Sequence, residues 1–113
     1  MNRSWSRMDW RVLPLSLCLL VFSAPLWAQG EGATLYKSKC VPCHGADGTA
    51  NTSVGKAMHI PDLTSADVQK QTDAELTAII TNGKGAMPAY KDKLSADQIK
   101  ETVGYIRELA KKK

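Results

Sequence analysis

The chain has 113 residues, a length typical of a single domain. Its 15 basic and 11 acidic residues give a formal net charge of +4, but three arginines and one aspartate lie within the first 28 residues. The remaining 12 basic and ten acidic residues leave a net charge of +2, which is too small to indicate a nucleic-acid-binding protein.

The first 28 residues have the three parts of a secretory signal peptide. Three arginines precede an uncharged, mostly apolar run over 12–28, which ends in small residues. We therefore predict a signal peptide at 1–28, cleaved after Ala28 or Gly30, and a single domain at 29–113. An uncleaved membrane anchor is the alternative, although the run is short for a bilayer span and is interrupted by two prolines and two serines.

The domain that follows is predicted to be all-α, with three or four short helices joined by loops. The first helix is expected from about Ala33 to Cys43. Spacings of four, four and three residues place four side chains on one stripe of that helix: Gly32, Tyr36, Cys40 and Cys43. A loop rich in glycine, asparagine, serine and threonine is expected at 45–61, followed by a short helix that opens at Thr64.

Two capping boxes predict where the later helices begin. The first box, Thr72 to Glu75, opens a helix that Asn82-Gly83 ends. The second box, Ser95 to Gln98, opens the last helix. The side chains expected to face the core are Leu76, Ile79 and Ile80 in the former helix and Ile99, Val103, Ile106 and Ala110 in the latter.

A core made only of these short helices is small for a stable domain. The two cysteines left after the predicted cleavage, Cys40 and Cys43, are too close together in the chain to close a useful disulfide loop. The sequence therefore indicates that a large buried prosthetic group completes the core.

Cys40-Val41-Pro42-Cys43-His44 has the C-x-x-C-H spacing of a covalent haem c attachment site. Two thiols at this spacing can reach two vinyl groups of one haem, and the histidine that follows can ligate the iron. A thioredoxin-like motif would require a βαβ context, and a zinc site would require more ligands than His44 and His59 supply. We therefore predict one covalent haem c, bound by Cys40 and Cys43, with His44 as an axial iron ligand.

The second axial position could be taken by Met87, Met58 or His59, or it could be empty. Met87 is the best placed, because glycines before it let the backbone approach a flat ring and Pro88 stiffens the chain after it. We therefore predict Met87 as the second axial ligand, and we interpret Met58 as core filler and His59 as a surface histidine.

The order of these landmarks resembles that of the class I cytochromes c, most closely the small soluble bacterial and photosynthetic types. The landmarks are C-x-x-C-H at 40–44, Pro-x-Leu at 61–63 and Asn-Gly-x-x-x-Met-Pro at 82–88. The resemblance covers essentially all of 29–113 and implies the cytochrome c fold around one haem. It also implies that the carbonyl of Pro61 accepts a hydrogen bond from the non-ligating nitrogen of His44, which would orient the imidazole.

The resemblance further implies that the first and last helices cross. Gly32 with Tyr36, and Gly104 with Tyr105, would mark the crossing, where the two glycines would let the backbones come close. Segment 29–113 has no tryptophan, so the indole that holds a haem propionate in mitochondrial-type members has no counterpart here.

Iron held by histidine and methionine has no open position, which favours electron transfer over catalysis. We therefore predict a monomeric one-electron carrier that works between larger redox proteins outside the cytoplasm, and not an enzyme. A peroxidase or oxidase module with a displaceable methionine and a membrane-tethered cytochrome subunit are the alternatives. Six lysines could steer docking of acidic partners, or could simply be solvated: Lys37, Lys39, Lys56, Lys84, Lys91 and Lys93.

Overall fold

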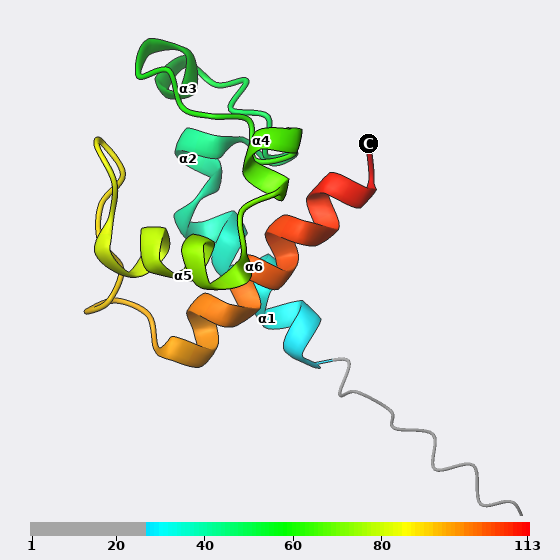
Figure 1. Ribbon diagram of the computed structural model, residues 1–113, viewed down its shortest axis with the longest axis vertical. Helices are drawn as coiled ribbons and strands as arrows, with labels where there is room; N and C mark the ends of the chain where they lie inside the picture. Colours follow the sequence, from blue (N-terminus) through cyan, green and yellow to red (C-terminus); the bar gives the residue numbers. More distant parts are fainter. Residues whose placement is uncertain (1–26) are drawn as a thin grey trace, which may run out of the picture.

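The computed structural model describes residues 27–113 (Figure 1), and this part of the chain is α-helical with one isolated bridge between Lys84 and Met87. Its helices are α1 (Trp27–Lys39), α2 (Val41–His44), α3 (Ser53–Ala57), α4 (Ala66–Gln69), α5 (Asp73–Asn82) and α6 (Ala96–Lys111). The all-α prediction is therefore confirmed. Most of the predicted signal peptide lies outside the described residues, and no helix within 27–113 is long and apolar enough to span a membrane.

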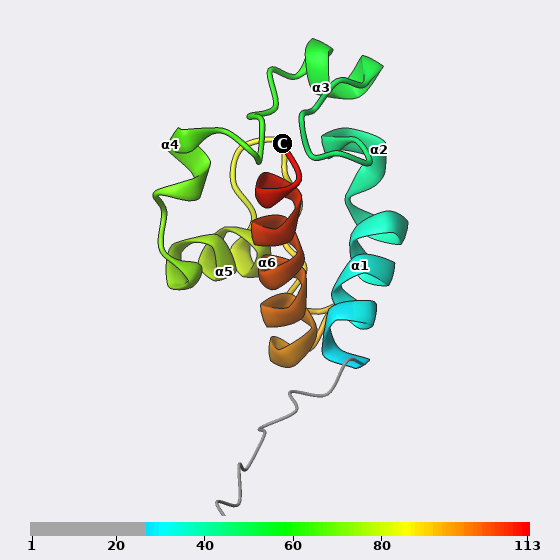
Figure 2. The same cartoon turned by 90° about the vertical axis from the view of Figure 1, so that its right-hand side faces the viewer.

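The predicted crossing of the first and last helices is present, because α1 lies against α6 (Figure 2). A Cβ atom on Gly32 would lie only 2.8 Å from the backbone carbonyl carbon of Glu101, so a glycine is required at this contact. The rings of Tyr36 and Tyr105 pack beside it, with centroids 5.2 Å apart. The expected role of Gly104 is wrong, since this residue is exposed and has open space around the position of a Cβ.

The single helix predicted from Ala33 to Cys43 is wrong in its bounds. Helix α1 begins at Trp27 and ends at Lys39, and α2 starts anew at Val41. Pro42 explains the break, because it has no backbone N–H to continue the hydrogen-bond ladder of α1. In the first turn of a new helix that N–H would have no partner anyway, so proline is tolerated there.

Both predicted capping boxes are present. Thr72 and Glu75 cap the start of α5, Ser95 and Gln98 cap the start of α6, and Gly83 ends α5 with a φ of 75°. The buried hydrophobic side chains form one core between α1, α4, α5 and α6: Tyr36, Val68, Leu76, Ile80, Leu94, Ile99, Val103, Ile106 and Leu109. Ile79 and Ala110 are only half-buried, and the register of α6 places Leu109 in the core instead of Ala110.

The segment between α2 and α5 differs most from its prediction. The loop expected at 45–61 contains the short helix α3, whose N-cap is Thr52. The next helix, α4, is capped by Ser65 and not by Thr64, because the Thr64 hydroxyl and amide are already bonded to Asp62. These short helices and the loop after α5 surround an open space beside the core.

Candidate functional site

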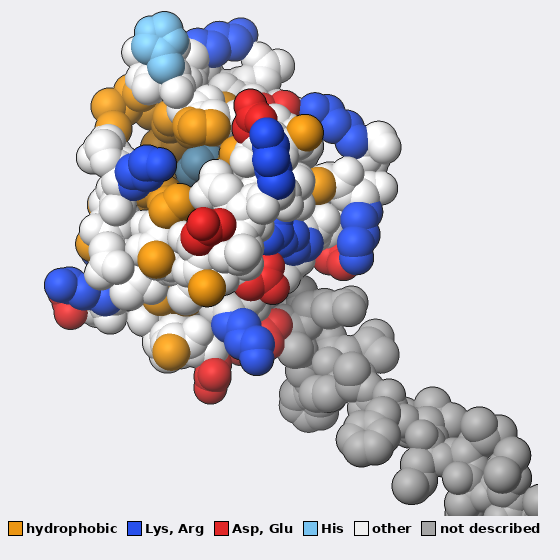
Figure 3. All heavy atoms as spheres, in the orientation of Figure 1, with side chains coloured by type: hydrophobic (Ala, Val, Ile, Leu, Met, Phe, Trp, Pro, Cys, Tyr) orange, Lys and Arg blue, Asp and Glu red, His pale blue; other side chains and the backbone are white. Residues whose placement is uncertain are grey.

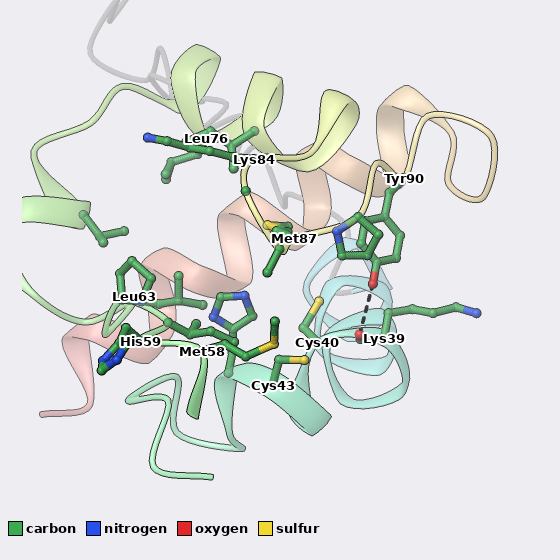
Figure 4. A pocket seen from close by; sticks show the side chains of 18 of the residues that line it. Lys39, Cys40, Cys43, Met58, His59, Leu63, Leu76, Lys84, Met87 and Tyr90 are labelled. Atoms are coloured by element: carbon green, nitrogen blue, oxygen red, sulfur yellow. Dashed lines mark hydrogen bonds between the residues drawn. The ribbon is translucent and has the colours of Figure 1, made fainter. Parts of the chain in front are cut away.

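A cavity of about 360 Å³ lies between the C-x-x-C-H segment and the loop that carries Met87. Cys40, Cys43 and His44 line it together with Met87, and Figure 4 shows the sulfur-bearing side chains of Cys40, Cys43 and Met87 extending toward the same space. Most of the remaining wall is apolar, formed by Ile60, Pro61, Leu63, Val68, Leu76, Ile79, Ala86 and Pro88. The hollow is open to one face of the molecule (Figure 3), and its volume is within the usual range of ligand pockets.

The peptide that carries Cys43 and His44 is held by three hydrogen bonds from two neighbouring segments, the loop before α3 and helix α1. The Thr52 hydroxyl donates to the carbonyl of Cys43 at 2.8 Å, and the Ala50 amide donates to the carbonyl of His44 at 2.7 Å. The buried hydroxyl of Tyr36 donates to the carbonyl of Gly45 at 2.7 Å. The carbonyls at the end of α2, which a helix leaves without internal partners, are therefore satisfied, and His44 is fixed at the cavity.

Burial shifts the pKa values of two of the three groups that would bind a haem from this side, Cys40 and His44. It raises the pKa of the Cys40 thiol to about 11, with the nearby Cys43 as a second cause, so the thiol is neutral at pH 7. Redox-active C-x-x-C pairs have lowered thiol pKa values, so this finding disfavours the thioredoxin-like alternative. Burial also lowers the pKa of His44, which keeps the imidazole neutral with a lone pair available to a metal.

The loop that carries Met87 is tethered on both sides of that residue. Lys84 and Met87 exchange two backbone hydrogen bonds of 3.1 and 3.0 Å, which close a tight turn. After the turn, the Tyr90 amide donates to the carbonyl of Ile80, and the Tyr90 hydroxyl donates to the carbonyl of Lys39 at 3.3 Å. The turn requires Gly83, since a Cβ there would lie 2.6 Å from the carbonyl oxygen of Met87.

The other candidate residues lie around the same cavity. Pro61 lines it, but the structure contains no hydrogen bond from His44 to Pro61, so that contact stays a prediction. Met58 is 53% exposed at the cavity rim, so its interpretation as core filler is wrong: the end of α3 lies too far from the core. His59 is exposed, as predicted. Gln71 also lines the cavity, and it lies in no recognisable sequence motif that predicts this position.

These residues fit a haem c. They supply two thiols for thioether bonds, an imidazole and a thioether, around a cavity with a mainly apolar wall. The Nδ1 atom of His44 is buried and has no hydrogen-bond partner in the described part of the chain. A buried polar atom without a hydrogen-bond partner is unfavourable. This indicates that the surroundings of His44 acquire their final hydrogen bonds only when haem c is bound.

Comparisons with known proteins agree with this geometry. A family profile described as "Cytochrome C oxidase, cbb3-type, subunit III" matches residues 28–106. Cytochrome c6 of Gloeothece citriformis is 35% identical over 106 residues, which are 87% of this chain and 90% of that protein. The solved structure of the KustC0563 c-type cytochrome is similar with a TM-score of 0.64 and 30% sequence identity, over 69% of this chain and 95% of that one.

The chain belongs to the class I c-type cytochromes. It is therefore an electron-transfer protein with one covalently bound haem c, as its sequence predicts, and not an enzyme. Two further relatives show the range of proteins that contain this domain. Cytochrome c6 of Leptolyngbya boryana is 37% identical over 72% of this chain and 92% of that protein. The cbb3-type cytochrome c oxidase subunit FixP of Bradyrhizobium sp. is 35% identical over 69% of this chain but only 26% of that subunit.

Proposed function

We propose that this cytochrome is a mobile one-electron carrier whose haem iron is ligated axially by His44 and Met87. The proposal depends on one observation: the cysteines and the histidine of the attachment motif line the same cavity as Met87, which comes from a different segment. Both axial candidates also line a smaller cavity of about 50 Å³. A bound haem c supplies an iron centre that accepts and releases one electron.

The cavity supports electron transfer better than catalysis. The neutral imidazole of His44 and the thioether of Met87 would occupy both axial positions, which leaves no open position for a substrate. The cavity wall in the described part of the chain contains no aspartate or glutamate, and its second histidine, His59, is exposed and not enclosed with a substrate position. These features disfavour the peroxidase or oxidase alternative.

The mouth of the cavity is positively charged, which suits a carrier that docks on larger, acidic redox partners. Lys39 and Lys84 are exposed and line the cavity. Charge of this kind raises the rate of encounter between partners while leaving the complex weak enough to dissociate. The other four lysines named from the sequence are also exposed: Lys37, Lys56, Lys91 and Lys93.

We infer a location outside the cytoplasm, in the periplasm or an equivalent compartment, because segment 1–28 has the parts of a signal peptide. We further propose that the exported domain acts as a monomer. Mass spectrometry of the exported protein checks this. A protein that begins after Ala28 or Gly30 supports a mobile carrier. One that retains Met1 would show that the apolar run tethers the domain to a membrane.

The axial ligands are tested by comparing the absorption spectra of the wild type, Met87→Ala and Met58→Ala. We expect Met87→Ala to lose the weak red absorption band of a ferric iron–methionine bond and to have a much lower reduction potential. Met58→Ala is the matched control, because it removes a methionine from the rim of the same cavity, and it should keep the band. A Met87→Ala variant with the wild-type spectrum would refute the assignment, as would loss of the band in Met58→Ala alone.

A further inference from the structure

One arginine joins the last helix to the segment between α4 and α5. Arg107 lies on α6, and its side chain is 23% exposed. Its Nη1 donates to both the backbone carbonyl and the side-chain Oε1 of Gln69, at 3.0 and 3.2 Å. Its Nη2 donates to the carbonyl of Gln71, and both Nε and Nη2 donate to Oδ1 of Asp73, at 3.1 and 2.9 Å.

This arginine adds support at two helix ends, the end of α4 and the start of α5, the second of which also has a capping box. Helix α4 has only four residues, and its last carbonyls have no partner inside the helix. Helices of this length are not stable alone, and Val68 is the one buried side chain of α4. By donating to the carbonyls of Gln69 and Gln71, Arg107 caps the end of α4 from outside. By pairing with Asp73 it also fixes the start of α5.

The segment held in this way is a wall of the haem cavity. Val68, from α4, and Gln71, from the turn after it, both line the cavity. Gln69 in turn contacts an earlier part of the wall, because its Nε2 donates to the carbonyl of Leu63 at 2.7 Å. Leu63 lines the cavity as well. The guanidinium on α6 therefore holds the end of this wall directly and Leu63 through Gln69, while Val68 anchors the same wall in the apolar core.

We propose that Arg107 is a positioning residue for the redox centre: its hydrogen bonds keep the wall from Leu63 to Gln71 closed over the cavity and exclude water from the haem. The proposal rests on the proposed function, since it assigns the electron-carrying group to this cavity. A dry, apolar environment disfavours the more highly charged ferric state and raises the reduction potential. Loosening this wall admits water and lowers the potential.

Two substitutions separate positioning from the effect of charge. Arg107→Gln removes the charge and the fork of donors. Arg107→Lys keeps the charge, but a single ammonium group cannot reproduce the fork. Lys111→Gln is the matched control, because it removes a positive charge from the same helix at a residue whose ammonium group pairs with Glu108, outside the wall.

The readouts are the reduction potential and amide hydrogen exchange in peptides that cover 63–71. In both Arg107 variants we expect the amides of 63–71 to exchange at least tenfold faster than in the wild type. We also expect a lower reduction potential, equivalent to at least a threefold smaller equilibrium constant for reduction of the haem. Lys111→Gln should keep the wild-type exchange rates and potential. A wild-type potential in Arg107→Lys would overturn the proposal and leave only a charge effect. Unchanged exchange in both variants would overturn it too.

The wild type provides a test that does not depend on whether the variants fold. The amides of Gln69, Lys70 and Gln71 are hydrogen-bonded within the wall, so they should exchange as slowly as amides of α6. If they exchange as fast as exposed loops, the wall is not held and the proposal fails. A failure of the proposed function would be seen in a different measurement, because it would remove the iron–methionine band from the wild-type spectrum. It would not change the exchange rates of these amides.

Discussion

The crossing of α1 and α6 and the walls of the haem cavity are built in different ways. At the crossing, Tyr36 and Val103 are 0% and 2% exposed, and the backbone of α6 contacts Gly32 directly. The walls include part of α5, but the rest consists of loops and the four-residue helices α2 and α4, and Met58 at the rim is an exposed hydrophobic side chain.

This difference shows which part of the fold depends on the prosthetic group. Side chains of the crossing bury one another, so the apolar surface that stabilises it comes from the chain itself. The cavity walls face an apolar space of about 360 Å³ that the chain does not fill. Covalent attachment of haem should therefore stabilise the walls far more than it stabilises the crossing.

Removal of the attachment site should have the largest effect. In a Cys40→Ala, Cys43→Ala variant that lacks haem, we expect helicity by circular dichroism to fall to a remnant. Hydrogen-exchange protection should disappear from the cavity walls and persist, if anywhere, in α1 and α6. If the walls of the haem-free variant stay as protected from hydrogen exchange as those of the haem-bound protein, the walls do not depend on haem and this distinction from the crossing is wrong.

A pair of glycine substitutions tests the crossing. Gly32→Ala forces a Cβ atom into the backbone of Glu101, so we expect it to lower the free energy of unfolding by about 1–3 kcal/mol. Gly104→Ala has open space and replaces glycine inside a helix, so it should raise stability by about 0.5–1 kcal/mol. Denaturant unfolding of the haem-bound protein measures both, and equal effects of the two substitutions would show that the helices do not cross at Gly32.

Tyr36 links the two regions, since its ring packs in the crossing and its hydroxyl bonds the carbonyl of Gly45 beside the attachment site. In Tyr36→Phe the ring remains, but this buried carbonyl keeps only the Gly48 amide as a donor, at 3.2 Å. We expect loss of the hydroxyl hydrogen bond to cost about 0.5–1.5 kcal/mol. The increase in hydrogen exchange should appear around Gly45 and not in α6. Increased exchange confined to α6 would mean that the hydroxyl does not support the cavity wall.

The smallest effect concerns Asp62, which adjoins Pro61 at the cavity. A hydrogen bond from the Thr64 hydroxyl lowers the pKa of Asp62 in the folded protein, and Lys113 pairs with it at 3.1 Å. Because the folded pKa lies below the unfolded value, this carboxylate stabilises the fold above about pH 4, and the contribution is lost as pH falls through the folded pKa. Asp62→Asn should therefore unfold at lower denaturant concentration at pH 7 but approach the wild type at pH 2–3. A difference between the two proteins that grows on acidification would reverse the sign and refute this role.

The sequence predicted those parts of the fold that depend on local signals. Both capping boxes, the end of α5 at Gly83 and the attachment motif are encoded within a few residues, and the structure contains them. The crossing at Gly32 was expected only from resemblance to a family, because nothing local shows which glycine meets another helix. For the same reason Gly104 was given a contact that it does not make.

What could not be predicted depends on contacts between distant segments. The bonds of Arg107 to Gln69, Gln71 and Asp73 join residues 34–38 positions apart, and no periodicity reveals them. The exposure of Met58 depends on how α3 sits above the cavity. The proximity of Met87 to the attachment motif was predicted because glycines and a proline in its own loop indicate a special role for that methionine.

The central claim is that His44 and Met87 close the iron from both sides. The most direct test is to add carbon monoxide to the reduced wild-type protein at neutral pH and to record the absorption spectrum. We expect no change in the spectrum, because neither axial position is free. Rapid formation of a carbon monoxide complex would show that one side of the iron is open, which would contradict the assignment of Met87 and the proposed role as a simple electron carrier.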